Sequence, residues 1–347
     1  MADTPHIRFP AEWEPQSGVQ LTWPHAGTDW RETLDEVLPC FVAIAREIAR
    51  RERLLIVCPD AAVAQRQLAD VDLARVRFVE LPTNDTWARD HAPLSVFEDG
   101  RPCVYDFTFN GWGLKFPAAL DNRITRELAR RGAFAPGVAY RNKLHRVFEG
   151  GSIESDGQGT LLTTEACLLS PNRNDHFSKT ELETFFLRTF GARRLLWLTN
   201  GYLAGDDTDS HIDTLARLCD ARTIAYVRCE DAHDEHAEAL GRMEAELRAF
   251  RTLSDEPYVL VPLPMAEPVF EDGQRLPATY ANFLIINGAV LMPTYRSPKD
   301  ETARARLAKA FPGREIVGID CLPLIKQHGS LHCVTMQYPE GFLCESV

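Results

Sequence analysis

A unit of two strands, a helix and one more strand recurs about every 60 residues, and this repeat constrains the fold more than any other feature. The hairpins are marked by Asp-Gly or Asn-Gly between apolar runs, a strong turn signal, at Asp99-Gly100, Asp156-Gly157 and Asn287-Gly288. Repeats of this period are typical of propellers and arrays. Because each unit mixes helix and strand, a closed α/β ring fits best, and closure would pair the last strand with the first.

Apolar periodicity predicts the members of the repeat. Helices are expected over 31–52, 61–71, 121–132, 179–190, 232–250 and 300–310. Strands are expected over 19–24, 54–58, 76–80, 93–97, 103–107, 146–148, 152–155, 160–169, 195–198, 221–228, 258–262 and 315–317, with a hairpin over 281–294 and a last strand from Cys333. No low-complexity linker interrupts the pattern, so we expect a single domain over 1–347.

Composition narrows the classes of partner. The net charge is −12 and no basic block occurs, which argues against nucleic acid and against an anionic membrane surface. The start, 1–6, lacks the basic and apolar regions of a secretory signal, and no apolar run is long enough to span a bilayer. Nine cysteines without a CxxC pair indicate neither a disulfide framework nor structural zinc. We expect a cytoplasmic protein whose cysteines are mostly small buried side chains.

The most acidic segment, 205–213, holds four aspartates and His211 within nine residues. Mutual repulsion among these carboxylates costs free energy that a cation would offset. Solvent and salt, a metal ion or a cationic substrate would each serve, and charge runs are usually solvated loops.

Four polar residues share the spacing of the repeat. Asp90 and Glu149 are 59 residues apart, Glu149 and His211 are 62 apart, and His211 and Cys333 are 122 apart, which is about two repeats. Quasi-symmetric repeats around an axis bring equivalent positions together at one end, so these four side chains are predicted to converge. Chance register is the alternative.

This combination favours nucleophilic chemistry on a cationic group. A thiolate beside an imidazolium is an activated nucleophile, although Cys333 alone could simply fill the core. Carboxylates grip a planar guanidinium with paired hydrogen bonds, so attack on a guanidinium carbon is the interpretation that uses all four residues. Asp90, His91 and Asp213 would also suit a two-metal hydrolase, but no HxH or HExxH motif supports that reading.

Five motifs, in order and across nearly the whole chain, resemble those of the agmatine deiminases, a bacterial peptidyl-arginine-deiminase-like family of the guanidine-modifying pentein superfamily. They are NDTWARD at 84–90, NGWG at 110–113, FEGG at 148–151, DDTDSHID at 206–213 and LHC at 331–333. The resemblance implies a five-bladed α/β propeller of pseudo-symmetric ββαβ repeats. It also implies hydrolysis of agmatine to N-carbamoylputrescine and ammonia in putrescine biosynthesis, without metal or organic cofactor, and it leaves room for a homo-oligomer.

The resemblance implies a role for each matching residue. Cys333 would attack the guanidinium carbon and form a covalent thiouronium, and His211 would act as general acid and then as base. Asp90 and Asp213 would hold the guanidinium. Glu149 would orient His211 and the substrate. Trp87 and Asp207 would lie near the alkyl chain and distal amine of the substrate.

Two departures from the family pattern bear on the substrate. Many relatives carry GGGNI before His-Cys, where this chain has QHGSL at 327–331, and many carry glycine in place of Ser210. Free or C-terminal peptidyl arginine would be the alternative substrate, and it would require a clamp for its α-carboxylate. Arg89 and Arg173 lie in or near the loops and could supply one, although a structural ion pair is the preferred interpretation of Arg89.

A non-catalytic guanidine-binding protein is a further alternative from a different class. Four more polar or aromatic residues either line the site or pack the core: Trp23, Trp112, Tyr295 and Asn282. Packing in the core is expected for Tyr295.

Overall fold

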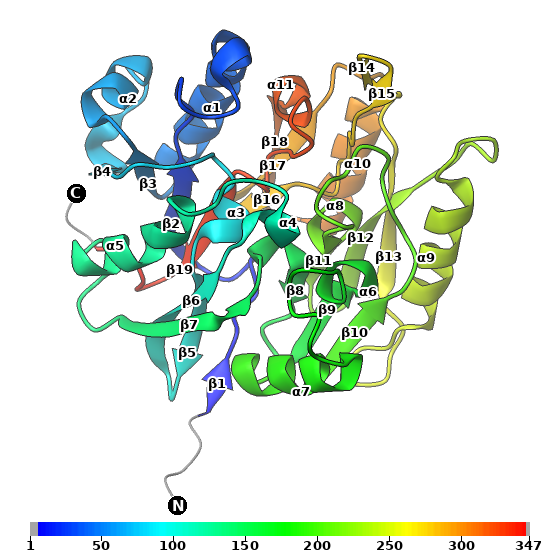
Figure 1. Cartoon of the computed structure of the whole chain (residues 1–347). Coiled ribbons are helices and arrows are strands. Elements are labelled where there is room, and N and C mark those ends of the chain that lie inside the picture. Colours follow the sequence, from blue (N-terminus) through cyan, green and yellow to red (C-terminus); the bar gives the residue numbers. More distant parts are fainter. Residues whose placement is uncertain (1–5, 345–347) are drawn as a thin grey trace, which may run out of the picture.

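Five sheets of three or four strands organise the chain in a computed structural model that describes residues 6–344 (Figure 1). In sheet order they are β19(Thr335–Pro339)-β2(Gln16–Thr22)-β3(Arg53–Cys58)-β4(Val76–Glu80), β1(Ile7–Arg8)-β5(Leu94–Glu98)-β6(Arg101–Thr108)-β7(Ala139–Val147), β10(Arg194–Leu198)-β9(Thr160–Thr164)-β8(Ile153–Ser155), β11(Ala216–Asp220)-β12(Thr223–Arg228)-β13(Val259–Pro264) and β16(Leu284–Ile286)-β17(Ala289–Thr294)-β18(Glu315–Asp320). A small hairpin, β14(Phe270–Glu271)-β15(Gln274–Arg275), lies outside them. The fold is therefore mixed α/β.

The same connection recurs in the sheets. Two antiparallel strands form a hairpin, a helix follows, and the next strand pairs in parallel with the second hairpin strand, as in β16-β17-α10-β18. The connecting helices are α1 (Leu34–Ala49), α2 (Ala61–Gln67), α5 (Ile124–Arg130), α7 (Lys179–Phe190), α9 (Ala237–Ala249) and α10 (Asp300–Ala310). These helices lie outward of the sheets in Figure 1.

The two ends of the chain meet in one sheet. The late strand β19 pairs antiparallel with the early strand β2, with Thr335 opposite Leu21, while β2, β3 and β4 are parallel. This pairing brings the segment after Cys333 next to the N-terminal strands, which the repeat had predicted for a closed arrangement.

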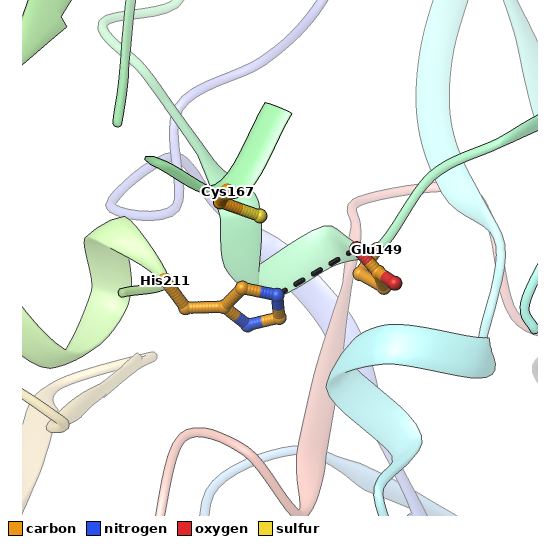
Figure 2. A group of neighbouring side chains, drawn as sticks. All are labelled: Glu149, Cys167 and His211. Carbon is orange, nitrogen blue, oxygen red and sulfur yellow. Dashed lines mark ion pairs between the residues drawn. The ribbon is translucent and has the colours of Figure 1, made fainter. Parts of the chain in front are cut away.

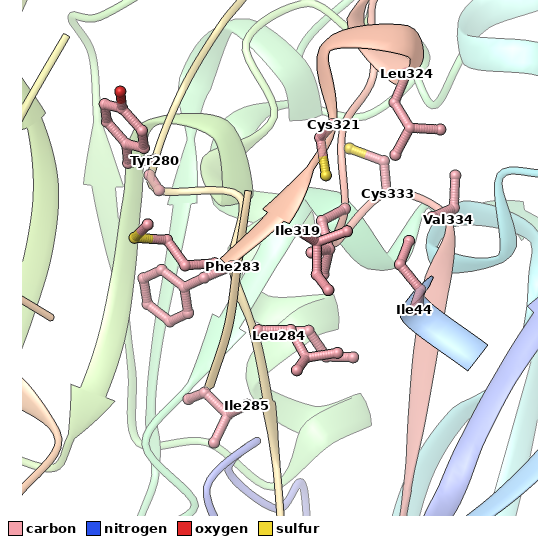
Figure 3. Packing of buried hydrophobic residues seen from close by; sticks show 14 of the residues in the cluster. Ile44, Tyr280, Phe283, Leu284, Ile285, Ile319, Cys321, Leu324, Cys333 and Val334 are labelled. Atoms are coloured by element: carbon pink, nitrogen blue, oxygen red, sulfur yellow. The ribbon is translucent and has the colours of Figure 1, made fainter. Parts of the chain in front are cut away.

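The helices bury one apolar stripe against the sheets. In α1 the fully buried positions Val37, Phe41, Ile44 and Ile48 follow the helical period, as the sequence predicted. The same cluster extends through β16 and the segment before β19 to Cys333, so the nucleophile candidate is anchored in the main core (Figure 3).

Several predicted bounds were wrong. The strand expected over 160–169 ends at Thr164, whose hydroxyl accepts from Cys167 N–H at 3.4 Å and caps α6 (Glu165–Leu168). The helix expected from 232 begins at Ala237, because Asp231 and Asp234 accept backbone N–H groups two residues on and form turns. The strand expected over 146–148 is the longer β7, and the helix expected over 61–71 ends at Gln67.

Other elements were not predicted at all. These are β1, β11, the β14-β15 hairpin and the four-residue helices α3 (Ala88–His91), α4 (Gly111–Leu114), α8 (Ile212–Leu215) and α11 (Leu322–Ile325). The last strand begins at Thr335 rather than at Cys333. Such short elements follow loop geometry rather than an apolar period, which needs a longer window to be recognised.

Within 6–344, none of the helices combines the length and apolar character needed to cross a membrane. The predicted lack of a secretory signal concerns the first residues of the chain, of which 1–5 lie outside the described residues. Seven of the nine cysteines are buried, as expected, and the other two are half-buried.

Candidate active site

A cavity of about 360 Å³ opens between loops that lie far apart in the sequence. Its lining combines carboxylates, aromatic rings and a thiol, and consists of Asp29, Asp85, Trp87, Asp90, Trp112, Phe116, Asp207, Thr208, Lys326, Gln327, His328, Gly329 and Cys333. Asp90 and Cys333 are buried, with 4% of each exposed, whereas Asp29 is exposed. The cavity therefore has a buried end that carries the thiol and an open end that carries a further carboxylate.

The carboxylate of Asp90, in α3, is held at the buried end by two donors. Its Oδ2 accepts from Trp112 Nε1 at 2.9 Å, and its Oδ1 accepts from Gly151 N–H at 3.0 Å. Burial raises the pKa of Asp90 to about 6, although the nearby His211 opposes the rise. A bound cation would favour the ionised form of this carboxyl.

His211 immediately precedes α8 and lies between two carboxylates. Its Nδ1 is 3.7 Å from Asp90 Oδ1, and its Nε2 is 3.7 Å from Glu149 Oε2, the ion pair drawn in Figure 2. Cys167, from α6, lies beside the same ring. Burial lowers the pKa of His211, but the charge of Asp90 and its other neighbours outweigh burial, so the pKa lies well above its usual range. The protonated ring is thus favoured.

Glu149 is itself held by an arginine. Both of its carboxylate oxygens accept from Arg173 Nε, at 2.9 and 3.1 Å. Burial would raise the pKa of Glu149, but its contacts with His211 and Arg173 outweigh burial and lower it. Glu149 is therefore ionised beside the imidazole.

Cys333 and Asp213 are joined through Asn282. The Cys333 Sγ lies 3.4 Å from Asn282 Oδ1, and Asn282 Nδ2 donates to the backbone carbonyl of Asp213 at 3.3 Å. The Asp213 Oδ2 accepts from His332 Nδ1 at 2.7 Å. Burial raises the pKa of the Cys333 thiol well above its usual range, and the charges of Asp213 and Asp90 raise it further.

Gly151 is the point where the predicted residues converge. A Cβ on this residue would lie 2.5 Å from His211 Nδ1, 2.8 Å from Asp90 Oδ1 and 3.1 Å from Asp213 Oδ2. Three side chains from two different repeats thus meet at one backbone position of a third, and only glycine leaves room for them.

We expect Gly151→Ala to reduce the catalytic rate strongly, by about 10²-fold, because displacing catalytic groups by about 1 Å has effects of that size. The matched control is Gly241→Ala in α9, where an added Cβ meets no atom within 4 Å. That control should leave activity unchanged and stabilise the helix by about 1 kcal/mol. Product formation and thermal unfolding, measured on both variants, check this expectation. Equal activity of the two variants would contradict the role of the close contacts.

Trp87 and Asp207, expected near the substrate chain and distal amine, both line the cavity. Burial raises the pKa of Asp207 to about 6, and Asp206 adds to the rise. Gly329 packs so closely on Trp87 that a Cβ there would lie 2.1 Å from the ring. The segment that presents Cys333 thus also fixes one wall of the cavity.

The two departures from the family pattern fall on unusual backbone. Ser210 has φ +65° and His328 has φ +66°, in the left-handed region that favours glycine. His328 Nδ1 contacts the Gly205 carbonyl at 2.7 Å, and Ser210 N–H donates to Asp206 Oδ2 at 2.6 Å. These side chains and hydrogen bonds offset a conformation that costs about 1–2 kcal/mol for a non-glycine residue.

Neither candidate for an α-carboxylate clamp lines the cavity. Arg173 binds Glu149, and it also binds Asp209 Oδ2 at 2.5 Å and the Thr208 carbonyl at 2.9 Å. Arg89 lies 3.9 Å from Glu12 and donates to the His332 carbonyl at 3.4 Å. The arginines have structural partners, as preferred for Arg89.

The four residues that the sequence assigned to either the site or the core divide between the two. Trp112 lines the cavity and Asn282 contacts Cys333, whereas Trp23 is buried and donates to Gln67 Oε1 at 2.7 Å. Tyr295 packs in the core, as expected, with its hydroxyl 2.9 Å from the Thr279 carbonyl.

Among the carboxylates and thiols of the site, sequence reasoning missed three: Asp29, Asp85 and Cys167. Asp85 lies inside the NDTWARD motif, next to residues that were singled out, so its position could have drawn attention to it. Burial raises its pKa to about 7. Asp29 and Cys167 carry no sequence signal that separates them from other aspartates and cysteines.

Two groups of side chains have the composition of metal ligands: Glu149, Cys167 and His211, and Glu12, Glu154 and His332. In each group an arginine already binds a carboxylate, Arg173 in the first and Arg217 in the second. A metal ion would have to displace or repel these guanidinium groups, so both sets fit ion-pair networks better than metal sites.

Comparison with known proteins finds relatives that match nearly the whole chain. A Porphyromonas gingivalis protein provisionally described as an arginine deiminase has 57% identity over 97% of this chain and 99% of its own, with a TM-score of 0.94. A substrate-bound cysteine-to-serine variant of the C. jejuni agmatine deiminase has 37% identity over 96% of this chain and 97% of its own, with a TM-score of 0.91. The agmatine deiminase of Pseudomonas aeruginosa is 34% identical over 96% of this chain and 95% of its own length.

The fold likeness extends further than the sequence likeness. The DDAH of Pseudomonas aeruginosa, a pentein, matches 93% of this chain with a TM-score of 0.50 at 13% identity, which concerns the mixed α/β fold alone. The model of the Porphyromonas-type peptidyl-arginine deiminase family matches residues 8–339, nearly the whole chain. The chain belongs to the Porphyromonas-type peptidyl-arginine deiminase family.

Proposed function

We propose that this protein hydrolyses agmatine to N-carbamoylputrescine and ammonia, with Cys333 as the nucleophile. One observation carries the choice of substrate: the cavity lining includes four carboxylates, of Asp90, Asp85, Asp207 and Asp29, and no arginine. Its lysine, Lys326, already pairs with Glu36 and Glu271. Agmatine is positively charged at both ends, so it matches this arrangement, whereas the carboxylate of arginine would be repelled. The agmatine deiminases of C. jejuni and P. aeruginosa are consistent with this choice.

The proposed reaction begins with binding of the guanidinium between Asp90 and Asp213. Its positive charge offsets the two carboxylates that, together with burial, raise the pKa of Cys333, so the thiol releases its proton to solvent and becomes a thiolate as substrate binds. The thiolate attacks the guanidinium carbon. His211, which favours its protonated form, donates a proton to one nitrogen, and the C–N bond breaks to release ammonia.

The second half of the reaction regenerates the thiolate. Water attacks the S-alkylthiouronium carbon while neutral His211 accepts its proton. The C–S bond then breaks, with the ureido product and the Cys333 thiolate as products. Ionised Glu149 supports His211 in both halves, because a neighbouring negative charge stabilises the imidazolium.

The proposal extends to the architecture. We infer a five-bladed propeller of ββαβ units in one domain. The recurring order of the five sheets and the pairing of β19 with β2 support this inference.

The experiment that tests the proposed function compares agmatine, free arginine and a peptide ending in arginine, with release of ammonia and ureido product as the readout. We expect turnover of agmatine well above that of the other two. Turnover of an arginine substrate alone would retain the chemistry and overturn the choice of agmatine. The arginine alternative has one observation in its favour, the 57% identity to the P. gingivalis protein.

A variant isolates the distal contact. We expect Asp207→Asn to lower kcat/KM for agmatine by about 10- to 100-fold, since a hydrogen bond to a charged group contributes about 1.5–3 kcal/mol. Butylguanidine, which lacks the distal amine, is the matched substrate, and its kcat/KM should change little. Equal losses with both compounds would assign Asp207 a structural role instead.

If no substrate is turned over, the guanidine-binding alternative gains support. Stoichiometric labelling of Cys333 by a haloacetamidine would then distinguish a reactive thiol from a core cysteine. Absence of both turnover and labelling would overturn the proposed function.

A further inference from the structure

A buried network of charged side chains joins Asp213 to the N-terminal segment of the chain. His332 Nδ1 lies 2.7 Å from Asp213 Oδ2, and the opposite ring nitrogen, Nε2, lies 2.8 Å from Glu12 Oε2. Arg217 Nη2 donates to the same Glu12 oxygen at 2.8 Å. All four side chains are buried. Asp213 meets Asp90 and His211 at Gly151, whereas His332, Glu12 and Arg217 are absent from the cavity lining and lie behind the site rather than in it.

The geometry decides the state of the His332 ring. Both nitrogens face carboxylate oxygens, so both must donate, which only the doubly protonated ring can do. Hydrogen bonds between charged groups are roughly twice as strong as neutral ones. The bond to Asp213 engages Oδ2, whereas Oδ1 has no hydrogen-bond partner among residues 6–344. Asp213 Oδ1 is therefore the oxygen left for a guanidinium N–H.

His332 also shares a hydrogen-bond acceptor with the neighbouring nucleophile, Cys333. Its backbone N–H and that of Cys333 both reach Asn282 Oδ1, at 2.9 and 3.3 Å. One residue thus contacts the carboxylate that binds the guanidinium and adjoins the thiol that attacks it.

We propose that His332, held by Glu12, is a positioning residue that orients Asp213 so that its free oxygen faces the guanidinium. Glu12 fixes the far side of the ring, the ring fixes one carboxylate oxygen, and the N-terminal segment thereby supports the substrate site. This inference rests on the proposed function, in which Asp213 binds the guanidinium. It assigns a role to two buried residues that do not line the substrate cavity.

The electrostatics give the sign of a pH effect. Burial raises the pKa of Asp213, but the hydrogen bond and charge of His332 lead the contacts that bring it below its usual range. A depressed pKa keeps Asp213 ionised to lower pH, so loss of the His332 contact should move the acid limb of kcat/KM to higher pH. The other charged or titratable groups around Asp213 and His332 are Glu12, Arg89, Asp90, Glu154, His211, Arg217 and Cys333.

Two substitutions of His332 form a matched pair. In His332→Asn the amide nitrogen replaces Nδ1 and keeps a donor toward Asp213, whereas in His332→Gln it replaces Nε2 and keeps a donor toward Glu12 only. Both remove the ring and its charge. We expect kcat/KM for agmatine to be about 10-fold or more higher in His332→Asn than in His332→Gln, the size of one hydrogen bond to a charged group. The acid limb should move to higher pH in both, further in His332→Gln.

A merely structural role predicts a different result. Equal losses of kcat/KM in the two variants, with their acid limbs at the same pH as in the wild type, would overturn the proposal. If neither variant folds, Glu12→Gln decides, because it keeps an acceptor oxygen toward the ring but removes the charge behind it. A shift of the acid limb to higher pH is expected for Glu12→Gln, and an unchanged limb would overturn the proposal. Lack of turnover in the wild type would instead reject the proposed function.

Discussion

Replacing Cys333 with serine should lower the rate of agmatine hydrolysis by about 10⁴-fold or more, as expected when a covalent nucleophile is removed. The serine hydroxyl is a much weaker nucleophile than a thiolate. Without the covalent thiouronium, the hydrolytic second half of the reaction is lost as well. Serine is nearly isosteric, and its hydroxyl can keep the contact with Asn282 Oδ1 that Cys333 makes at 3.4 Å. Release of ammonia and of ureido product, together with thermal unfolding, measures both effects.

The control separates burial from chemistry. Cys103 in β6 is also buried, with 1% exposed, and it lies outside the cavity lining. Cys103→Ser should change stability by an amount similar to Cys333→Ser, but it should leave turnover intact. Residual activity above about 1% of wild type in Cys333→Ser would contradict the assignment of the nucleophile, given the size of such losses in other enzymes.

Replacing Arg217 with methionine should lower the free energy of unfolding by about 3–5 kcal/mol, the cost of breaking a buried charge network. The Arg217 side chain is fully buried. It donates to Glu154 Oε1 at 2.5 Å, to Glu12 Oε2 at 2.8 Å and to the Phe283 carbonyl at 2.5 Å. Methionine fills part of the volume but leaves two buried carboxylates without this partner. Denaturant unfolding, followed by fluorescence, measures the loss.

An exposed arginine provides the comparison. Arg242 in α9 pairs with Glu238, one helical turn away, and 64% of its side chain is exposed. Arg242→Met should change the free energy of unfolding by less than about 0.5 kcal/mol, as for other exposed pairs. A cost for Arg217→Met no larger than this would show that the network does not hold the fold together.

The repeat was predictable because its signals are local. The helices over 179–190 and 300–310 have the predicted bounds, and each predicted Asp-Gly or Asn-Gly turn joins two antiparallel strands. The capping box of Ser178 and Glu181 shows why α7 begins where it does, since both of its hydrogen bonds lie within four residues. The proximity of His211 to both Asp90 and Glu149, at 3.7 Å in each case, agrees with the spacing of the repeat.

The acidic segment over 205–213 shows what the local sequence could not predict. A solvated loop was the ordinary interpretation, yet none of its residues is exposed. Three of the four aspartates have partners of their own: Asp206 accepts from the Thr208 hydroxyl, Asp209 binds Arg173, and Asp213 binds His332. Asp207 lines the cavity. The partners of Asp209 and Asp213 come from other parts of the chain, which the segment itself does not contain.

β11 illustrates the same limit. Its five residues, Ala216–Asp220, place Arg217 in a buried strand, where an apolar period gives no warning of a charge. The charge is tolerated because Glu12 and Glu154, 205 and 63 residues away, meet it there.

The sequence by itself determined the order of the strands and helices, the turns between them, and the kinds of side chain available for chemistry, because these depend on interactions within a few residues. Only the tertiary structure decided which charges meet, how deeply each is buried and which oxygen of Asp213 remains free. Desolvation and Coulomb interactions depend on distance in space, so the pKa shifts of Cys333, His211 and Asp90, on which the proposed reaction depends, exist only when the whole chain has folded.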